Sequence, residues 1–297
     1  MRVVRDLHQD AAPYEVLMPE RQSRPFVFNS PHSGTAYPQA FLEASRLDSR
    51  AIRRSEDAFV DELVAGVVDL GAPLMRAHFP RAFLDLNREP YELDPKMFRG
   101  RLPAYVNARS TRVAGGLGTI ARIVAENEEI YAGLLEVEEA LQRIETLYKP
   151  YHERLRKLLA RTHVDFGFAV LIDCHSMPSM IRGQDPRNRP DIILGDRYGT
   201  SCSPDLTAAA VDALEDLGYR VARNKPYAGG FITEHYGKPG KGLHALQLEI
   251  NRAVYMDERS LEPTADFARV QADLTRMAEC LFEVAGEQFG PSALAAE

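Results

Sequence analysis

The chain has 297 residues, of which 45% are hydrophobic and 27% are charged, values typical of a globular protein with a substantial core. Its formal net charge of −7 argues against a protein that wraps nucleic acid or an anionic membrane, because phosphate groups attract basic surfaces. No apolar run approaches the roughly 20 residues that span a bilayer. The N-terminal residues lack the apolar core of a secretory signal, and the three widely spaced cysteines fit no disulfide framework, so we expect a cytoplasmic protein.

Short apolar runs alternate with amphipathic helical patterns along the chain. The expected strands are 25–29, 73–77, 82–86, 167–173, 191–195, 219–223 and 244–250. Several of them are continuous apolar runs, which indicates strands buried on both faces of a sheet. The expected helices are 57–69 with Ser55 as N-cap, 135–161 kinked or split by Pro150, 204–217 with Ser203 as N-cap, and 262–286.

Strands interleaved with helices predict an α/β layered sandwich. No linker rich in proline, glycine and serine divides the chain, so we expect one domain over 1–297. The glycine- and proline-containing stretch 87–118 is interpreted as an irregular insertion over one sheet edge.

Polar side chains follow several of the predicted strands. His32 lies in "SPHSG" after 25–29, "NR" at 87–88 follows 82–86, His175 lies in "DCHSM", and "EINR" begins at Glu249 near the end of 244–250. Sites in open α/β sheets collect at the carboxyl ends of strands, so we expect these groups to converge. Ser33, beside His32, is then a candidate hydrogen-bond donor to a substrate.

The two histidines suggest a metal site, because both lie in loops of small residues that leave room for an ion. A catalytic zinc site uses three protein ligands and keeps one position open. Asp57 is the preferred third ligand, although Glu56 beside it is barely distinguishable from sequence and both fit the acidic first turn of a helix. Taken singly, each histidine also fits an ordinary loop or strand-end residue. Zinc is favoured, and cobalt, manganese or iron suit the same ligands.

Glu249 interrupts an otherwise apolar strand. Burying a carboxylate there costs free energy unless the group has a functional role or a partner of opposite charge. Two interpretations stay open: a salt bridge to Arg252, or a general base that takes a proton from metal-activated water and passes it to the leaving amine. Arginines near the predicted strand ends indicate recognition of a carboxylate or phosphate, with surface charge as the alternative.

The motifs "SPHSG", "SEDAFVDEL", "RAFLDLNR" and "DCHSM", followed by "GGFITEHYGKP" and "HALQLEINRAVYMDE", occur in this order over most of the chain and resemble the N-formylglutamate amidohydrolases. This family is distantly similar to zinc carboxypeptidases and aspartoacylases. The resemblance implies a three-layer αβα sandwich with a mixed central sheet, of the phosphorylase/hydrolase-like kind, and a zinc-dependent amidohydrolase.

Carried over motif by motif, the resemblance also implies roles for individual residues. The ligands of one zinc ion would be His32, Asp57 and His175, and Glu249 would be the base. Arg81 would polarise the scissile carbonyl group, Asn87 and Arg88 would hold the α-carboxylate of the substrate, and Arg182 or Arg252 would lie near a second carboxylate.

Three functions are consistent with these observations. The first is metal-dependent hydrolysis of a small acidic N-formyl or short N-acyl amino acid, above all of N-formyl-L-glutamate to glutamate and formate. The second is a non-catalytic protein of the same fold that binds an acidic metabolite. The third is a related metallo-hydrolase that acts on another amide or a short peptide.

Overall fold

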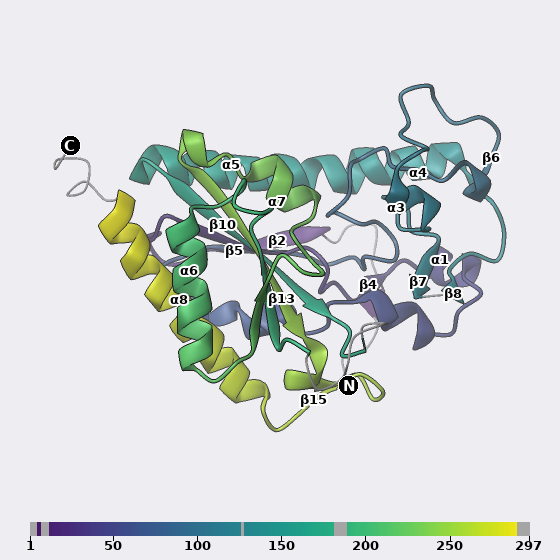
Figure 1. The fold of residues 1–297 in the computed structure, drawn as a ribbon. Helices are drawn as coiled ribbons and strands as arrows, with labels where there is room; N and C mark the ends of the chain where they lie inside the picture. Colours follow the sequence, from purple (N-terminus) through teal and green to yellow (C-terminus); the bar gives the residue numbers. More distant parts are fainter. Residues whose placement is uncertain (1–4, 7–11, 126–127, 181–188, 290–297) are drawn as a thin grey trace.

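The computed structural model describes residues 5–6, 12–125, 128–180 and 189–289 (Figure 1). Its centre is a seven-stranded mixed sheet with the strand order β12–β11–β13–β10–β3–β5–β2. These strands are β12 (Val221–Arg223), β11 (Ile192–Gly195), β13 (Leu243–Asn251), β10 (Ala169–Met177), β3 (Phe26–Ser30), β5 (Leu74–Ala77) and β2 (Tyr14–Leu17). From β13 to β5 neighbouring strands are parallel, as are β11 and β12, whereas β11–β13 and β5–β2 are antiparallel.

Helices cover both faces of this sheet (Figure 1). One face packs on α2 (Val60–Leu63), α6 (Pro204–Asp216) and α8 (Phe267–Phe289), and the other on α5 (Lys149–Phe166) and α7 (Phe231–Tyr236). α4 (Val137–Arg143) precedes α5 and lies over the region beside the sheet, on the right in Figure 1. Side chains along β10 point alternately to the two faces of the sheet and so contribute to both hydrophobic cores. Val170 and Ile172 face α8, and Ala169 and Leu171 face α5. The predicted three-layer α/β sandwich is confirmed. No helix in the described ranges is long and apolar enough to cross a membrane.

The remaining α-helices and strands are short. They are the helices α1 (Gln39–Ala44) and α3 (Thr111–Ala114) and the strand pairs β1 (Arg5–Asp6) with β4 (Ala36–Tyr37), β6 (Phe98–Arg99) with β9 (Leu135–Glu136), β7 (Ile123–Ala125) with β8 (Glu128–Glu129), and β14 (Met256–Asp257) with β15 (Glu262–Pro263). α1, α3, β6, β7 and β8 gather beside the sheet, on the right in Figure 1. The predicted irregular insertion 87–118 thus contributes α3 and β6 to this region.

The predicted strand 82–86 is wrong. Phe83 and Leu84 both donate their backbone N–H groups to the carbonyl oxygen of Pro80, which makes a turn instead of a strand. Leu84 and Leu86 are nevertheless buried in the core beneath α5. A packed turn therefore produces the same apolar run as a buried strand.

The predicted helix 57–69 is interrupted. Only α2 and the 3₁₀ turn Ala65–Val67 form, and Phe59, which precedes α2, has a φ of 66°. Ser55 ends the 3₁₀ helix η1 (Ala51–Ser55) and does not cap α2. Glu56, which is extended, and Asp57 therefore lie in the connection between η1 and α2 and not in a first helical turn.

The other long helices form with small differences in their limits. The predicted helix 135–161 consists of α4, a π-helical turn at Ile144–Tyr148 and α5. Pro150 lies in the first turn of α5, and the π-helical turn just before it accommodates the proline, so the helix continues. α8 begins at Phe267, five residues later than the predicted start at 262.

Candidate metal centre and active-site cleft

Three side chains able to bind a metal ion meet at the carboxyl end of the sheet. His32 follows β3, His175 lies near the end of β10, and Asp57 lies between η1 and α2. Because β3 and β10 pair in parallel, their carboxyl ends reach the same edge. The three side chains are buried, and one ligand atom from each lies within 4.8 Å of the others. The Nδ1 atoms of His32 and His175 lie 3.3 and 3.0 Å from Oδ2 of Asp57.

The second nitrogen of each imidazole lies against a different carboxylate. Nε2 of His32 is 2.8 Å from Oδ1 of Asp85, and Nε2 of His175 is 2.8 Å from Oδ2 of Asp173. A proton on each Nε2 leaves each Nδ1 as a lone-pair donor that faces Asp57. Within the described part of the chain, Nδ1 of His32 is buried without a hydrogen-bond partner. Histidines backed by carboxylates in this way are typical metal ligands, and the donor set fits a divalent transition metal.

Glu56, the sequence alternative to Asp57, is turned away from the histidines. Its carboxylate accepts a hydrogen bond of 2.6 Å from the hydroxyl of Tyr37. Arg53 donates to both of its oxygens through Nε and Nη2 at distances between 2.9 and 3.1 Å. Since Glu56 is fully engaged in this buried network, Asp57 is the carboxylate that faces the two imidazoles.

Asp57 and Asp85 are held in their ionised form. Burial raises the pKa of Asp57, but hydrogen bonds and attraction from His175 and His32, whose Nδ1 atoms can carry a proton toward Asp57 when no metal ion is bound, hold that pKa well below its usual range. Burial likewise opposes ionisation of Asp85, and attraction from Arg81 and Arg88 holds its pKa well below the usual range. Asp57 and Asp85 therefore present negative charge to a cation at neutral pH.

Glu249 enters the same site from β13, where it pairs in register with His175 of β10. Gln247 donates its amide N–H to Oε1 of Glu249 at 2.8 Å and accepts a hydrogen bond of 2.7 Å from the backbone of Gly230. Burial raises the pKa of Glu249 to about 7, against the attraction of His175. A carboxyl group with a pKa near neutrality is suited to both take up and release a proton.

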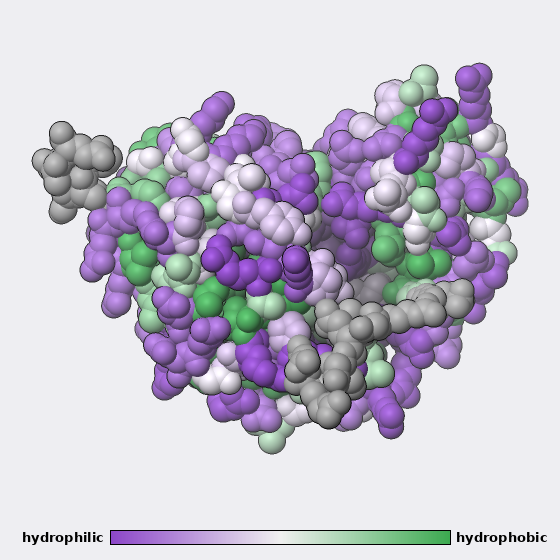
Figure 2. All heavy atoms as spheres, viewed as in Figure 1, coloured by the Kyte–Doolittle hydropathy of each residue, from purple (hydrophilic) through white to green (hydrophobic). Residues whose placement is uncertain are grey.

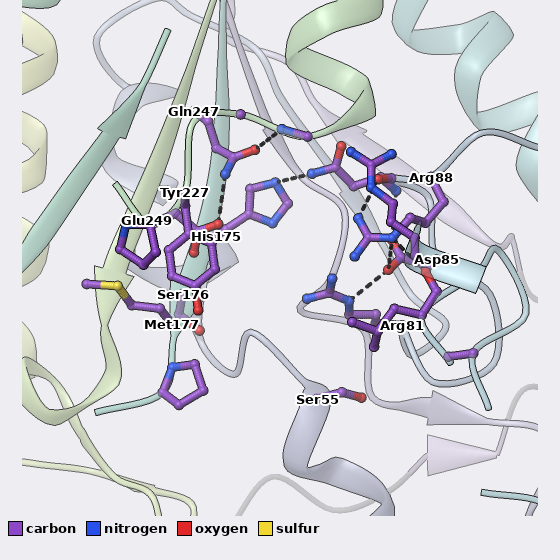
Figure 3. A pocket seen from close by; sticks show the side chains of 18 of the residues that line it. Ser55, Arg81, Asp85, Arg88, His175, Ser176, Met177, Tyr227, Gln247 and Glu249 are labelled. Carbon is purple, nitrogen blue, oxygen red and sulfur yellow. Dashed lines mark hydrogen bonds and ion pairs between the residues drawn. The ribbon is translucent and has the colours of Figure 1, made fainter. Parts of the chain in front are cut away.

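A cleft of about 500 Å³ opens onto these residues. Figure 2 shows it as a hollow between the part of the molecule that carries α6 and α8 and the part that carries α3 and β7. In the close view of Figure 3, Arg81, Asp85 and Arg88 lie opposite Glu249. The lining includes the six arginines Arg54, Arg81, Arg88, Arg112, Arg197 and Arg252. Their excess over the two lining carboxylates makes the cleft suitable for an anionic ligand.

Arg81 and Arg88 flank the carboxylate of Asp85. Arg81 donates through Nε to Oδ2 of Asp85 at 3.0 Å, and its terminal nitrogens have no hydrogen-bond partner among the residues described. Nε of Arg88 lies 3.8 Å from the same oxygen and donates to the carbonyl of Leu117 at 2.9 Å. Asp85 thereby joins the ligand His32 to the arginines of the cleft.

Ser33 is occupied by a protein contact, because it donates to the backbone carbonyl of Asp57 at 2.8 Å. Oδ1 of Asn87 accepts a hydrogen bond of 2.8 Å from the backbone of Ile232, which orients its amide group in the cleft lining. Nδ2 of Asn87 lies 3.2 Å from Nε2 of His175, but a protonated Nε2 is itself a donor, so Asn87 keeps its N–H groups for a ligand. Ser33 therefore supports the loop of Asp57, and Asn87 stays a candidate for substrate binding.

Arg252 is bound on all three of its nitrogens. It donates to the hydroxyl of Ser176 at 3.0 Å, to the carbonyl of Arg54 at 3.0 Å and to Oδ1 of Asp57 at 3.4 Å. Its carboxylate partners in the described part of the chain are Asp57 and, at 3.7 Å, Glu258, and not Glu249. Arg182, the other candidate for a second carboxylate, lies outside the described residues.

Asp173 and Gln247 are two site residues that were not predicted from the sequence. Each lies two residues before a predicted site residue on the same strand, His175 and Glu249 respectively. Side chains two apart on a strand share a face, so this spacing was a usable signal. Cys174, between Asp173 and His175, points into the opposite core, as that alternation requires.

Comparison with known proteins gives a consistent picture. The sequence model of the family N-formylglutamate amidohydrolase matches residues 24–256. The chain is 32% identical over 250 residues to an N-formylglutamate deformylase of Pseudomonas aeruginosa, covering 83% of this chain and 87% of that protein. It is 32% identical over 237 residues to an N-formylglutamate deformylase of Pseudomonas putida, covering 79% and 82% of the two chains. The crystal structure of N-formylglutamate amidohydrolase from Ralstonia eutropha JMP134 superposes with a TM-score of 0.86 at 35% identity, covering 92% of this chain and 99% of that one.

Proposed function

The chain belongs to the N-formylglutamate amidohydrolase family, and on that premise we propose that it hydrolyses N-formyl-L-glutamate to L-glutamate and formate with the help of one bound metal ion. The observation that carries the proposal is the buried group His32, Asp57 and His175 beside Glu249, at the base of a cleft rich in arginine. Relatives named as deformylases of the same compound support the choice of substrate.

Zinc is the ion that we propose for His32, Asp57 and His175, which offer two imidazole nitrogens and one carboxylate. Such an ion, when bound, supplies a Lewis acid that acts on the formyl carbonyl group and on water. The protein's part is to hold the ligands in place. Asp85 and Asp173 fix the two imidazole rings, and Arg252 with Ser176 fixes the carboxylate of Asp57.

Glu249 acts as the general base in the proposed reaction. It takes a proton from the attacking water, the water oxygen bonds to the formyl carbon, and the carbon–nitrogen bond then breaks. Glu249 returns the proton to the departing amino nitrogen, so that formate and glutamate are released. The hydrogen bond from Gln247 holds Oε1 and leaves Oε2 for this transfer.

Arg81 stabilises the negative oxygen of the tetrahedral intermediate in this scheme. Its Nε is anchored on Asp85, so its terminal N–H groups are available to the site. Arg88 binds the α-carboxylate of the substrate. Asn87, whose Oδ1 is held by the backbone of Ile232, binds the same carboxylate through Nδ2. For Ser33 and Arg252, whose donors contact the protein, we propose that they orient Asp57.

A substrate panel combined with metal analysis tests the proposal. The protein is purified without chelator, its metal content is measured, and hydrolysis is assayed with N-formyl and N-acetyl derivatives of glutamate, aspartate, glutamine and alanine. We expect about one metal ion per chain, loss of that ion in His32→Ala, and highest turnover with N-formyl-L-glutamate. A metal-free protein that binds N-formylglutamate without hydrolysing it would support the non-catalytic alternative. Hydrolysis of another amide, and of no N-formyl amino acid, would support the third function, a related metallo-hydrolase with a different substrate.

A further inference from the structure

Among the arginines that line the cleft, Arg112 has no part in the proposed reaction. Arg112 lies on α3, in the insertion beside the sheet, and lines the cleft together with Arg88. The two arginines are tied to one segment of backbone: Leu117 donates its N–H to the carbonyl of Arg112, and its own carbonyl accepts from Nε of Arg88. Burial and the nearby positive charges of Arg81 and Arg112 lower the pKa of Arg88, so the charge of Arg112 lies close to that of Arg88 in the wall of the cleft.

The carboxylates around this pair leave it incompletely neutralised. Asp85, which lies 3.8 Å from Arg88, also serves His32 and Arg81. Behind Arg112 lies Glu92, whose Oε2 is 3.7 Å from Nη1 of Arg112, too far for a hydrogen bond. Glu92 is buried, and Oε2 has no hydrogen-bond partner in the described part of the chain. Glu92 therefore fixes the position of Arg112 by charge while leaving its N–H groups available.

The buried backbone behind Arg112 makes this position rigid. The carbonyl of Glu92 accepts a hydrogen bond of 2.8 Å from the backbone of Thr119. A Cβ atom on Gly118 would come within 2.3 Å of the same oxygen, so only glycine fits at this position. The lining beside Arg112 is apolar and includes Leu117, Ala121 and Ile123. A charged group next to an apolar wall suits a ligand that carries a carboxylate on a short methylene chain.

The order of the groups along the cleft determines which carboxylate each arginine meets. Asp85, which contacts His32, also contacts Arg81 and Arg88, whereas the carboxylate beside Arg112 is Glu92. Arg112 therefore lies further from the metal ligands than Arg81 and Arg88. In an N-formyl dicarboxylic amino acid, the α-carboxylate is one carbon from the amide nitrogen, and the side-chain carboxylate of glutamate is three carbons beyond the α-carbon. Resting on the proposed function, we infer that Arg112, backed by Glu92, binds the side-chain carboxylate of the substrate and selects dicarboxylic N-formyl amino acids.

The test compares N-formyl-L-glutamate with N-formyl-L-glutamine, which has the same shape without the side-chain charge. Steady-state kinetics are measured for the wild type, Arg112→Met, Arg112→Lys and the control Arg109→Met, an exposed arginine three residues away that does not line the cleft. We expect Arg112→Met to raise KM for the glutamate derivative at least about tenfold, to leave kcat/KM for the glutamine derivative unchanged, and so to remove the preference. Arg112→Lys should keep part of the preference, and Arg109→Met all of it.

An equal loss of kcat/KM on both substrates, or an unchanged preference, would overturn the inference. If the wild type hydrolyses neither compound, the proposed function fails, and equilibrium titration still tests Arg112. Glutarate, a dicarboxylate, is then compared with its monoamide on the wild type and on Arg112→Met. Weaker binding of glutarate alone to the variant supports the role of Arg112, and equal affinities reject it.

Discussion

Glu249→Gln changes the charge of one buried site residue without changing its shape. Burial raises the pKa of Glu249 from an ordinary value of 4.5 to about 7. Because the folded chain holds this proton more tightly than the unfolded chain, the stabilising contribution of the protonated carboxyl is fully present below pH 4.5 and is lost as the pH rises through about 7. At about 1.36 kcal/mol per pKa unit, the difference between 4.5 and about 7 corresponds to about 3 kcal/mol. Glutamine avoids this loss and still accepts the hydrogen bond from Gln247.

The assay follows urea unfolding of the metal-free protein at pH 4.5 and at pH 8. Glu249→Gln should match the wild type at pH 4.5 and exceed its free energy of unfolding by up to about 3 kcal/mol at pH 8. The control Glu215→Gln, at an exposed position of α6, should follow the wild type at both pH values. With metal restored, Glu249→Gln should retain the ion and lose about 100- to 10,000-fold in kcat. Wild-type turnover, or a stability difference that is the same at both pH values, would refute the reasoning.

Further predictions concern the surroundings of Glu249 and the metal ligands. In the metal-loaded wild type, kcat/KM should fall with decreasing pH as Glu249 takes up a proton. The midpoint should lie at or below about pH 7, because a bound cation favours the ionised carboxylate of Glu249. A flat profile from pH 5 to 8 would argue against Glu249 as the base. Gly230→Ala places a Cβ atom 2.4 Å from the amide of Asn87 and should lower kcat/KM at least about tenfold, whereas Gly133→Ala, with nothing within 4 Å, should be neutral in the same assay. Asp85→Asn weakens the support of His32 and should lower metal affinity about 10- to 100-fold in a chelator competition titration, and unchanged affinity would remove Asp85 from the centre.

The main elements of the fold followed from the sequence because their patterns are local. Continuous apolar runs marked the central strands β3, β10 and β13, and side-chain alternation along β10 and β13 fixed which residues face each core. The prediction failed at 82–86, where a turn beginning at Pro80 buries the same apolar side chains as a strand. It also missed the edge strand β2, whose four residues are only partly buried.

The sequence by itself also placed His32, His175 and Glu249 at strand ends, and parallel pairing requires such ends to meet. Which neighbouring carboxylate joins them depends on contacts between distant segments. From the sequence alone, Glu56 and Asp57 are equally suitable as the carboxylate ligand. In the folded protein Arg53 and Tyr37 hold Glu56 away from the site, and Asp57 faces the imidazoles.

The arginines show the same division. Their number and their places after the strands indicated an anionic ligand. The sequence does not show, however, whether the N–H groups of an arginine are available to a ligand or already bound to protein acceptors. Tertiary structure commits every nitrogen of Arg252 to protein acceptors and brings Arg112, from a short helix in the insertion, beside Arg88 in the cleft. Chemical types and strand-end positions are therefore properties of the local sequence, whereas the choice of partner for each charge is made only when segments far apart in the chain pack together.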